Sequence, residues 1–275
     1  MHIYKKLVQP YVVWISIFLV IPMLLLVVYA FSTIGNNVLT LQFTLDNFIR
    51  FFKDKVFIDV LFASFRIAFM TTLICILLGY PMAYSIAKMR IKNSAFFILL
   101  ITLPMWINML VRTYAWIGIL SDHGLINNIL EFFGWGSLHM IHTEFAVVLG
   151  MVYNFLPFMI LQIHASLAKM DHSLLEASAD LGASNIDTFR KIILPLSLPG
   201  VLSGITLVFL PAVSSFFIPK LLGGGSQLLV GNLIENYFIT SGDWNFGSAI
   251  SFIMALCVMA SLYLTKKVDK GGDAS

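Results

Sequence analysis

Six long apolar runs, separated by shorter polar segments, form the main pattern of this chain. Each is close to the ~20 residues that a helix needs to cross a hydrocarbon core of about 30 Å. Backbone amides in lipid must find partners within their own segment, so unbroken apolar runs predict helices, whereas barrel strands would alternate. The sequence therefore predicts an all-α polytopic membrane protein, a single transmembrane domain over residues 1–275, with spans at about 11–31, 62–87, 95–120, 145–168, 199–218 and 247–264.

The composition excludes an ordinary soluble domain. Hydrophobic residues make up 59% of the chain and charged residues 11%, whereas soluble domains carry about 25% charged residues. A net charge of +3 gives no indication of nucleic-acid binding. Cys75 and Cys257 both lie inside apolar runs without a neighbouring ligand-type residue, so we expect free thiols and no metal site.

The distribution of lysine and arginine predicts the orientation. Eleven of the 17 fall in segments 1–10, 88–94, 169–198 and 265–275, and four fall in the alternate loops. Because positive residues favour the cytoplasmic side, we expect both termini in the cytoplasm. Arg112 lies within or at the end of the third span, where an ionisable group is a functional candidate. We expect it to pair with Asp122 or to extend to the outer interface.

The cytoplasmic loop between the fourth and fifth spans, 169–195, contains two helix-start signals. Ser173 with Glu176, and Ser184 with Asp187, each fit a capping box. Gly182 stands between them, where a left-handed residue ends the first helix.

We expect Pro195 to end the second of these short helices. On the first, Leu174, Ala177, Ser178 and Leu181 form a stripe whose middle is small. Small residues allow close approach, which favours docking into a partner's groove. Packing on the protein's own bundle is the alternative.

The spacing of this loop resembles the EAA loop of ABC-importer permeases. Glu176-Ala177-Ser178, three residues, Gly182, nine residues and Ile192-Ile193-Leu194-Pro195 reproduce the whole signature, with Ser178 in place of its second alanine. The resemblance implies the type I ABC-importer permease fold, with this loop as the helix that couples to the ATPase subunit. The implied contacts are Glu176, Ala177, Ser178, Leu181, Gly182 and Ala183.

Other stretches are similar to the spermidine/putrescine permeases of that family. They are 43–47, 103–106, 152–158, 228–232 and 243–247. The resemblance implies a polyamine importer in the bacterial inner membrane, with a second homologous permease subunit, two ABC ATPase subunits and an extracytoplasmic substrate-binding protein.

We expect no enzymatic activity and no cofactor in this chain. It has no G-x-x-x-x-G-K-[ST], and Gly223-Gly224-Gly225 is not followed by lysine, so ATP and Mg²⁺ are expected on the partner subunit.

Aromatic and amide side chains on the third and fourth spans are the candidates for a solute pathway, since aromatic faces attract cations. Packing and interfacial anchoring are alternative roles for these residues. Two further functions stay open: a permease for another small solute, and a secondary transporter, although neither internal repeats nor buried acids are evident. A membrane-embedded enzyme would need a nucleophile or metal cluster. The candidate pathway residues are Trp106, Asn108, Tyr114, Tyr153 and Asn154, with Trp116 beside them.

Overall fold

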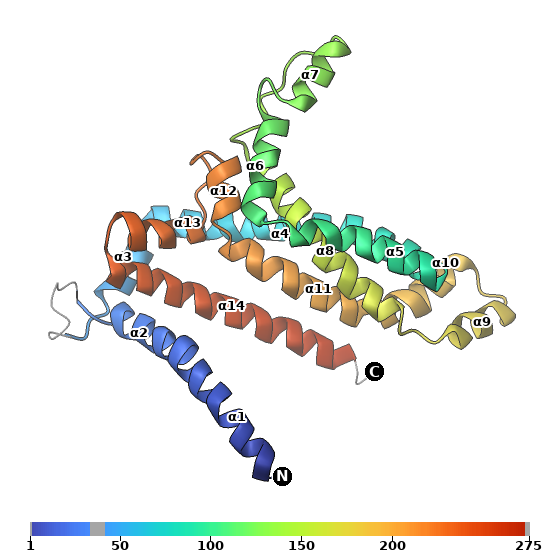
Figure 1. Cartoon of the computed structure of the whole chain (residues 1–275), viewed down its shortest axis with the longest axis horizontal. Helices are drawn as coiled ribbons and strands as arrows, with labels where there is room; N and C mark the ends of the chain where they lie inside the picture. The colour runs from blue at the N-terminus through green and yellow to red at the C-terminus, as the bar shows by residue number, and fades with distance from the viewer. Residues whose placement is uncertain (1, 34–41, 273–275) are drawn as a thin grey trace.

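The computed structural model describes residues 2–33 and 42–272, and its regular structure is helical (Figure 1). Within these residues no β-strand occurs, and the one bridge between extended segments joins Ser32 to Phe43. The all-α prediction is therefore confirmed. The helices are α1 His2–Ile15, α2 Ile21–Ala30, α3 Asp46–Lys53, α4 Lys55–Ala87, α5 Ile91–Thr102, α6 Met109–Leu120, α7 Leu125–Phe132, α8 Glu144–Leu167, α9 His172–Asp180, α10 Asn185–Thr188, α11 Leu194–Ser214, α12 Phe217–Leu222, α13 Val230–Glu235 and α14 Trp244–Gly272.

Short turns of other helical types join several of these helices. Three are π-helical and one is a 3₁₀ helix, so some neighbouring helices run on without a break. They are η1 Ser16–Val20, η2 Leu103–Trp106, η3 Phe189–Ile193 and η4 Asn236–Thr240.

Five helices of the described chain are long and apolar enough to cross a membrane, and a bent pair makes up to six. Five of the six predicted spans are therefore single helices of spanning length, and the sixth corresponds to the bent pair. The five are Pro10–Ala30, Lys55–Ala87, Glu144–Leu167, Asn185–Ser214 and Trp244–Tyr263.

The third predicted span, 95–120, is not one straight helix. Ile91–Trp106 and Met109–Phe132 meet at an angle of 91°. Pro104 lies in the 3₁₀ turn η2, and Ile107 and Asn108 adopt extended backbone conformations. The Asn108 side chain then accepts a hydrogen bond from the Leu110 amide at 2.8 Å, which starts α6 afresh. A proline followed by a new cap residue explains the break.

The core of the molecule lies around α8, which packs between α4 and α11. α14 runs beside α2 and contacts α3 and α13. In Figure 1 the long helices run roughly along the length of the molecule, with α9 and α10 at one end and α3 at the other. The molecule therefore presents two ends, and the loop 169–195 occupies one of them.

Candidate coupling loop and transmembrane pathway

The loop 169–195 is built as two short helices joined at a glycine, as predicted. Gly182 has φ +74°, the left-handed region that glycine adopts without strain. Its amide donates to the Ala179 carbonyl at 2.9 Å, and the Ala183 amide donates to the Ser178 carbonyl at 3.0 Å. These bonds complete a helix end of the kind in which a left-handed residue follows the last turn.

The two helix starts differ in how well the sequence predicts them. Ser184 Oγ accepts from the Asp187 amide at 3.1 Å, so the second start is confirmed. The first prediction is wrong by two residues, because Asp171 caps α9 by accepting from the Ser173 amide at 2.9 Å. Both Asp and Ser are good cap residues, and the aspartate precedes the serine in the chain.

Ser178 is buried, unlike the other residues of its predicted contact set. Its hydroxyl donates to the Leu175 carbonyl at 2.9 Å and lies 3.1 Å from the Thr188 hydroxyl. Ser178, which stands in place of the second alanine of the EAA signature, therefore joins α9 to α10 through this contact. This role is invisible in the sequence because Thr188 lies beyond the turn.

Pro195 does not end the second short helix, contrary to the prediction. α10, η3 and α11 form one continuous helix from Asn185 to Ser214. η3 (Phe189–Ile193) is a wider π-helical turn that ends two residues before the proline. The proline lacks an amide hydrogen and its ring needs extra room, and a π-turn provides an irregular site for both. The loop thus leads directly into a span.

The loop is also attached to α4 through an aromatic cluster. The Phe189 ring meets Tyr80 and Tyr84 edge to face, with centroids 5.8 and 5.7 Å apart. The Tyr80 hydroxyl lies 2.8 Å from the Ser197 hydroxyl on α11. A displacement of the loop therefore acts on both α4 and α11.

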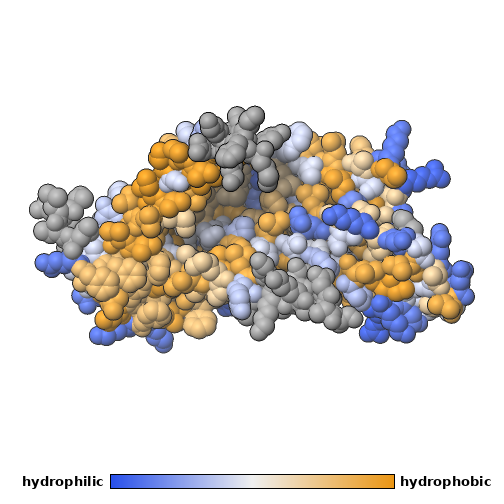
Figure 2. Space-filling view, turned by 90° about the horizontal axis from the view of Figure 1, so that it is seen from below, coloured by the Kyte–Doolittle hydropathy of each residue, from blue (hydrophilic) through white to orange (hydrophobic). Residues whose placement is uncertain are grey.

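The outer surface of the loop is open in this chain. Leu181 is 88% exposed and Ile186 is 70% exposed. Glu176, Ala177, Gly182 and Ala183 are exposed as well. Figure 2 shows hydrophilic residues at both ends of the molecule, including the right-hand end, where α9 and α10 lie in Figure 1. Ile186 is an exposed apolar residue that the sequence reasoning did not single out.

A cavity of about 440 Å³ lies at the base of this loop, between α8, the start of α9 and α11. Its polar lining includes Gln162, Ser166, Lys169 and Ser203. Sequence patterns gave no signal for it, because its residues come from two separated stretches of the chain, 162–174 and 196–203.

The structure separates the candidate pathway residues into exposed and enclosed ones. Trp106 is 79% exposed and Tyr114 is 59% exposed, and Asn108 is exposed at the break of the bent span. Tyr153 packs edge to face on Trp116, with centroids 5.4 Å apart. Asn154 is buried, and its amide donates to the Gly150 carbonyl at 2.8 Å. Their role in a pathway stays a prediction.

Arg112 does not pair with Asp122, since that carboxylate contacts His139 Nδ1 at 2.9 Å. Its Nε and Nη1 atoms are buried, and neither has a hydrogen-bond partner among the described residues. A half-buried guanidinium therefore lies in the bent span without a counter-ion from the described part of its own chain.

Stretches 43–47 and 243–247, which carried part of the resemblance, hold the end of α2. The Asn47 amide donates to the Ala30 and Ser32 carbonyls, each at 3.1 Å. The Asn245 amide donates to the Ser32 hydroxyl at 2.7 Å and to two backbone carbonyls. These amides satisfy carbonyls that a helix end leaves without partners. Both asparagines thus have structural roles.

Residues 1–271 match the family of binding-protein-dependent transport system inner membrane components. The chain belongs to this family. It is a membrane-spanning permease subunit of an ABC transporter.

This permease is 38% identical over 267 residues to the spermidine/putrescine transport system permease protein PotB of Haemophilus influenzae, covering 93% of each chain. It is equally similar to PotB of Escherichia coli K12, covering 93% of this chain and 97% of the relative. The inner membrane ABC transporter permease protein YdcU of E. coli is 31% identical over 250 residues, with 86% and 78% coverage.

Solved structures show the same fold. A chain of a bacterial alginate ABC transporter, in complex with its alginate-bound periplasmic protein, aligns with a TM-score of 0.81 at 17% identity, covering 96% of the permease and 92% of that chain. An inward-facing MetNI methionine ABC transporter aligns at 0.56 with 14% identity, covering 78% and 95%. The predicted type I importer permease fold is therefore confirmed.

Proposed function

We propose that this permease is one of two homologous membrane subunits of an importer for polyamines such as spermidine and putrescine. The supporting observation is the 38% identity to PotB proteins over nearly the whole length of both chains. A permease for another small solute is the second candidate, because the similarity to YdcU also extends over most of the chain.

The importer contains two ABC ATPase subunits that bind ATP and Mg²⁺, and an extracytoplasmic substrate-binding protein delivers the solute. The permease lies in the bacterial inner membrane with both termini cytoplasmic, since eleven of its 17 lysines and arginines fall on that side. α9, Gly182 and the start of α10 then face the ATPase.

Coupling follows from how the loop is held. The exposed residues Glu176, Ala177 and Leu181 enter a groove of the ATPase subunit, with Gly182 and Ala183 at the turn. When that groove moves, α11 moves with it, because α10 and α11 form one continuous helix. The movement also passes into α4 through Phe189 and the two tyrosines. Trp106 and Tyr114, which are exposed, offer aromatic faces to the ammonium groups of the solute.

The test is spermidine-stimulated ATPase activity of the importer complex in lipid, comparing wild type with Gly182→Asp. Aspartate at φ +74° is strained and adds a charge at the docking turn. Gly242→Asp is the matched control: Gly242 has φ +67°, an added Cβ would have no atom within 4 Å, as at Gly182, and the residue lies in the loop before α14. Both variants are first checked for expression and insertion.

We expect Gly182→Asp to remove the stimulation and Gly242→Asp to retain it. Equal stimulation in the wild type and Gly182→Asp would show that the loop does not couple. A wild-type complex that spermidine and putrescine fail to stimulate, while another solute does, would replace the polyamine assignment and leave the permease function intact.

A further inference from the structure

The short helix α7, at the end of the bent pair and before the segment that leads to α8, carries an apolar stripe that the described chain leaves uncovered. In α7, Leu125, Ile129 and Phe132 fall at i, i+4 and i+7, on one face of the helix. They are 61%, 49% and 85% exposed. Phe133 and Trp135 follow directly and are 71% and 69% exposed. We call these five residues the α7 stripe.

The remainder of α7 is polar or packed inward. Asn128 and Glu131 are exposed on the face next to the stripe. Ile126 and Leu130 are half-buried, and Asn127 is fully buried. The helix is therefore amphipathic, and its apolar side points away from its own chain.

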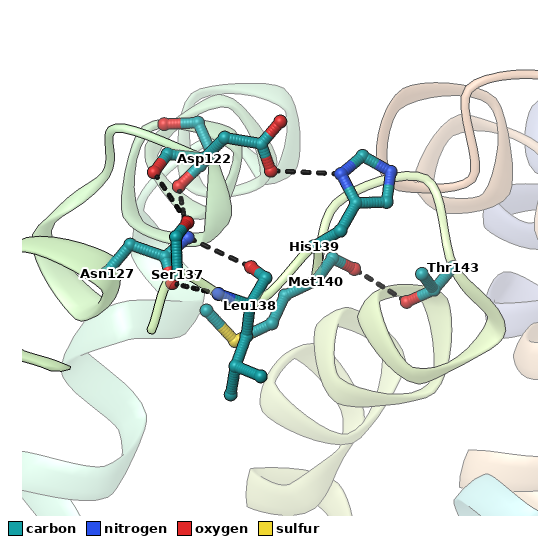
Figure 3. A network of polar contacts seen from close by, with 8 residues as sticks. Asp122, Asn127, Ser137, Leu138, His139, Met140 and Thr143 are labelled. Carbon is teal, nitrogen blue, oxygen red and sulfur yellow. Dashed lines mark hydrogen bonds and ion pairs between the residues drawn. The ribbon is translucent and has the colours of Figure 1, made fainter. Parts of the chain in front are cut away.

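A network of hydrogen bonds fixes the stripe in this orientation (Figure 3). The Asn127 side chain donates to the Leu138 carbonyl at 2.9 Å and accepts from the Leu138 amide at 2.8 Å. It also donates to the Ser121 carbonyl at 3.1 Å. His139 contacts Asp122 at 2.9 Å. α7 is thus held rigidly against the segment 137–143.

That segment places α7 at the level of the membrane surface. Residues 137–143 lead directly into α8, whose first residue is Glu144 and whose cap is Thr143. Because α8 is a span, its first turn lies at one surface of the bilayer. α6 and α7 project sideways from the bundle, across the direction of the long helices (Figure 1). The helix therefore lies near the plane of that surface.

We propose that α7 is an interfacial helix whose stripe inserts among the lipid acyl chains at the surface opposite the coupling loop. An exposed, rigid apolar surface in water is unfavourable, and Trp and Phe are favoured at the interface. The stripe has no charge with which to select a protein. Its five side chains are also few beside the ~20–30 residues per side of a standard protein interface. This inference is independent of the transported solute.

Cysteine accessibility in the assembled importer in nanodiscs tests the inference. Cys75 and Cys257 are first replaced by alanine, and single cysteines are introduced as Ile129→Cys, Phe132→Cys or Glu131→Cys. The rate of reaction with a charged, membrane-impermeant maleimide is then measured. We expect the two stripe positions to react about tenfold or more slowly than the adjacent Glu131→Cys control, because acyl chains exclude the reagent. Equal rates would place the stripe in water and overturn the proposal.

Spin labels on the same cysteines distinguish lipid from a covering protein. A label among acyl chains collides often with oxygen and rarely with a polar nickel chelate. We expect this signature at positions 129 and 132, and the reverse at 131. Low collision rates with both reagents at 129 and 132 would show that another subunit covers the stripe, which contradicts the proposal. Two independent stripe positions guard against one substitution that fails to fold.

Discussion

Arg112 shows how a single side chain conflicts with its surroundings. Two of its nitrogens are buried without partners among the described residues. Asp122 contacts His139 and Glu144 contacts Arg66 at 2.6 Å, so neither of these carboxylates is the partner of Arg112. A buried charge without a counter-ion is costly, whereas an apolar residue of similar length is not.

We therefore expect Arg112→Met to stabilise the importer complex in detergent. The gain should be about 1 kcal/mol, or roughly 2–4 °C in Tm, measured by the thermal unfolding of this subunit. Arg66→Met is the matched control and should change Tm little, because that arginine is 59% exposed and surface ion pairs contribute little. A lower Tm for Arg112→Met than for the control would mean that another subunit supplies the counter-ion.

At the scale of helices, the contact of α8 with α11 depends on small residues. A Cβ added to Gly200 would lie 2.7 Å from the Gln162 carbonyl oxygen and 3.2 Å from the Ile163 Cα. A Cβ on Gly204 would lie 2.5 Å from Met159 Sδ, an atom of a flexible side chain. Backbone atoms cannot move aside as a methionine can. Gly200 and Gly204, a pair of small residues four positions apart, therefore permit close packing of α11 on α8.

Gly200→Ala should consequently destabilise the subunit more than Gly204→Ala. We expect a loss of about 1–3 kcal/mol for Gly200→Ala, because α11 must move away from α8, and a smaller loss for Gly204→Ala. Thermal unfolding of the two variants in parallel measures the difference. Equal losses, or a larger one at Gly204, would contradict the packing described here.

The sequence predicts elements well where lipid dictates the pattern and poorly where local geometry decides. Five apolar runs correspond to spanning helices, because a helix is the solution that satisfies every amide in lipid. The break at Ile107–Asn108 was missed, since prolines in other runs, such as Pro157 in α8, leave the helix continuous. Pro195 was misjudged for the opposite reason, because a π-turn accommodates it.

The residues of the candidate coupling loop also fall into two groups: those that the local sequence predicts and those that depend on contacts between separate segments. Gly182 and Ser184 follow from turn and cap chemistry, which is local in sequence. The contacts of Ser178 with Thr188, and of Phe189 with two tyrosines, cross between separate segments. No spacing rule encodes them.

The whole molecule connects two ends through continuous elements. At one end the exposed α9–α10 loop continues into α11 without a break and packs against α4 through Phe189. At the other end Asn47 and Asn245 hold α2, and α7 projects sideways from the bundle with its apolar stripe exposed (Figure 1). Between them α4 and α11 pack on α8, and α14 packs on α11 and α2. In the importer that we propose, force applied at the loop changes access to a pathway shared with the second permease.

The most direct test of this account is spermidine uptake into proteoliposomes that contain ATP. The complete importer, with its substrate-binding protein outside, should accumulate spermidine, and proteoliposomes with this chain alone should not, under any ion gradient. Uptake by the importer that depends on ATP would support a permease driven by separate ATPase subunits. Uptake by this chain alone, driven by a proton or sodium gradient, would contradict the account and indicate a secondary transporter.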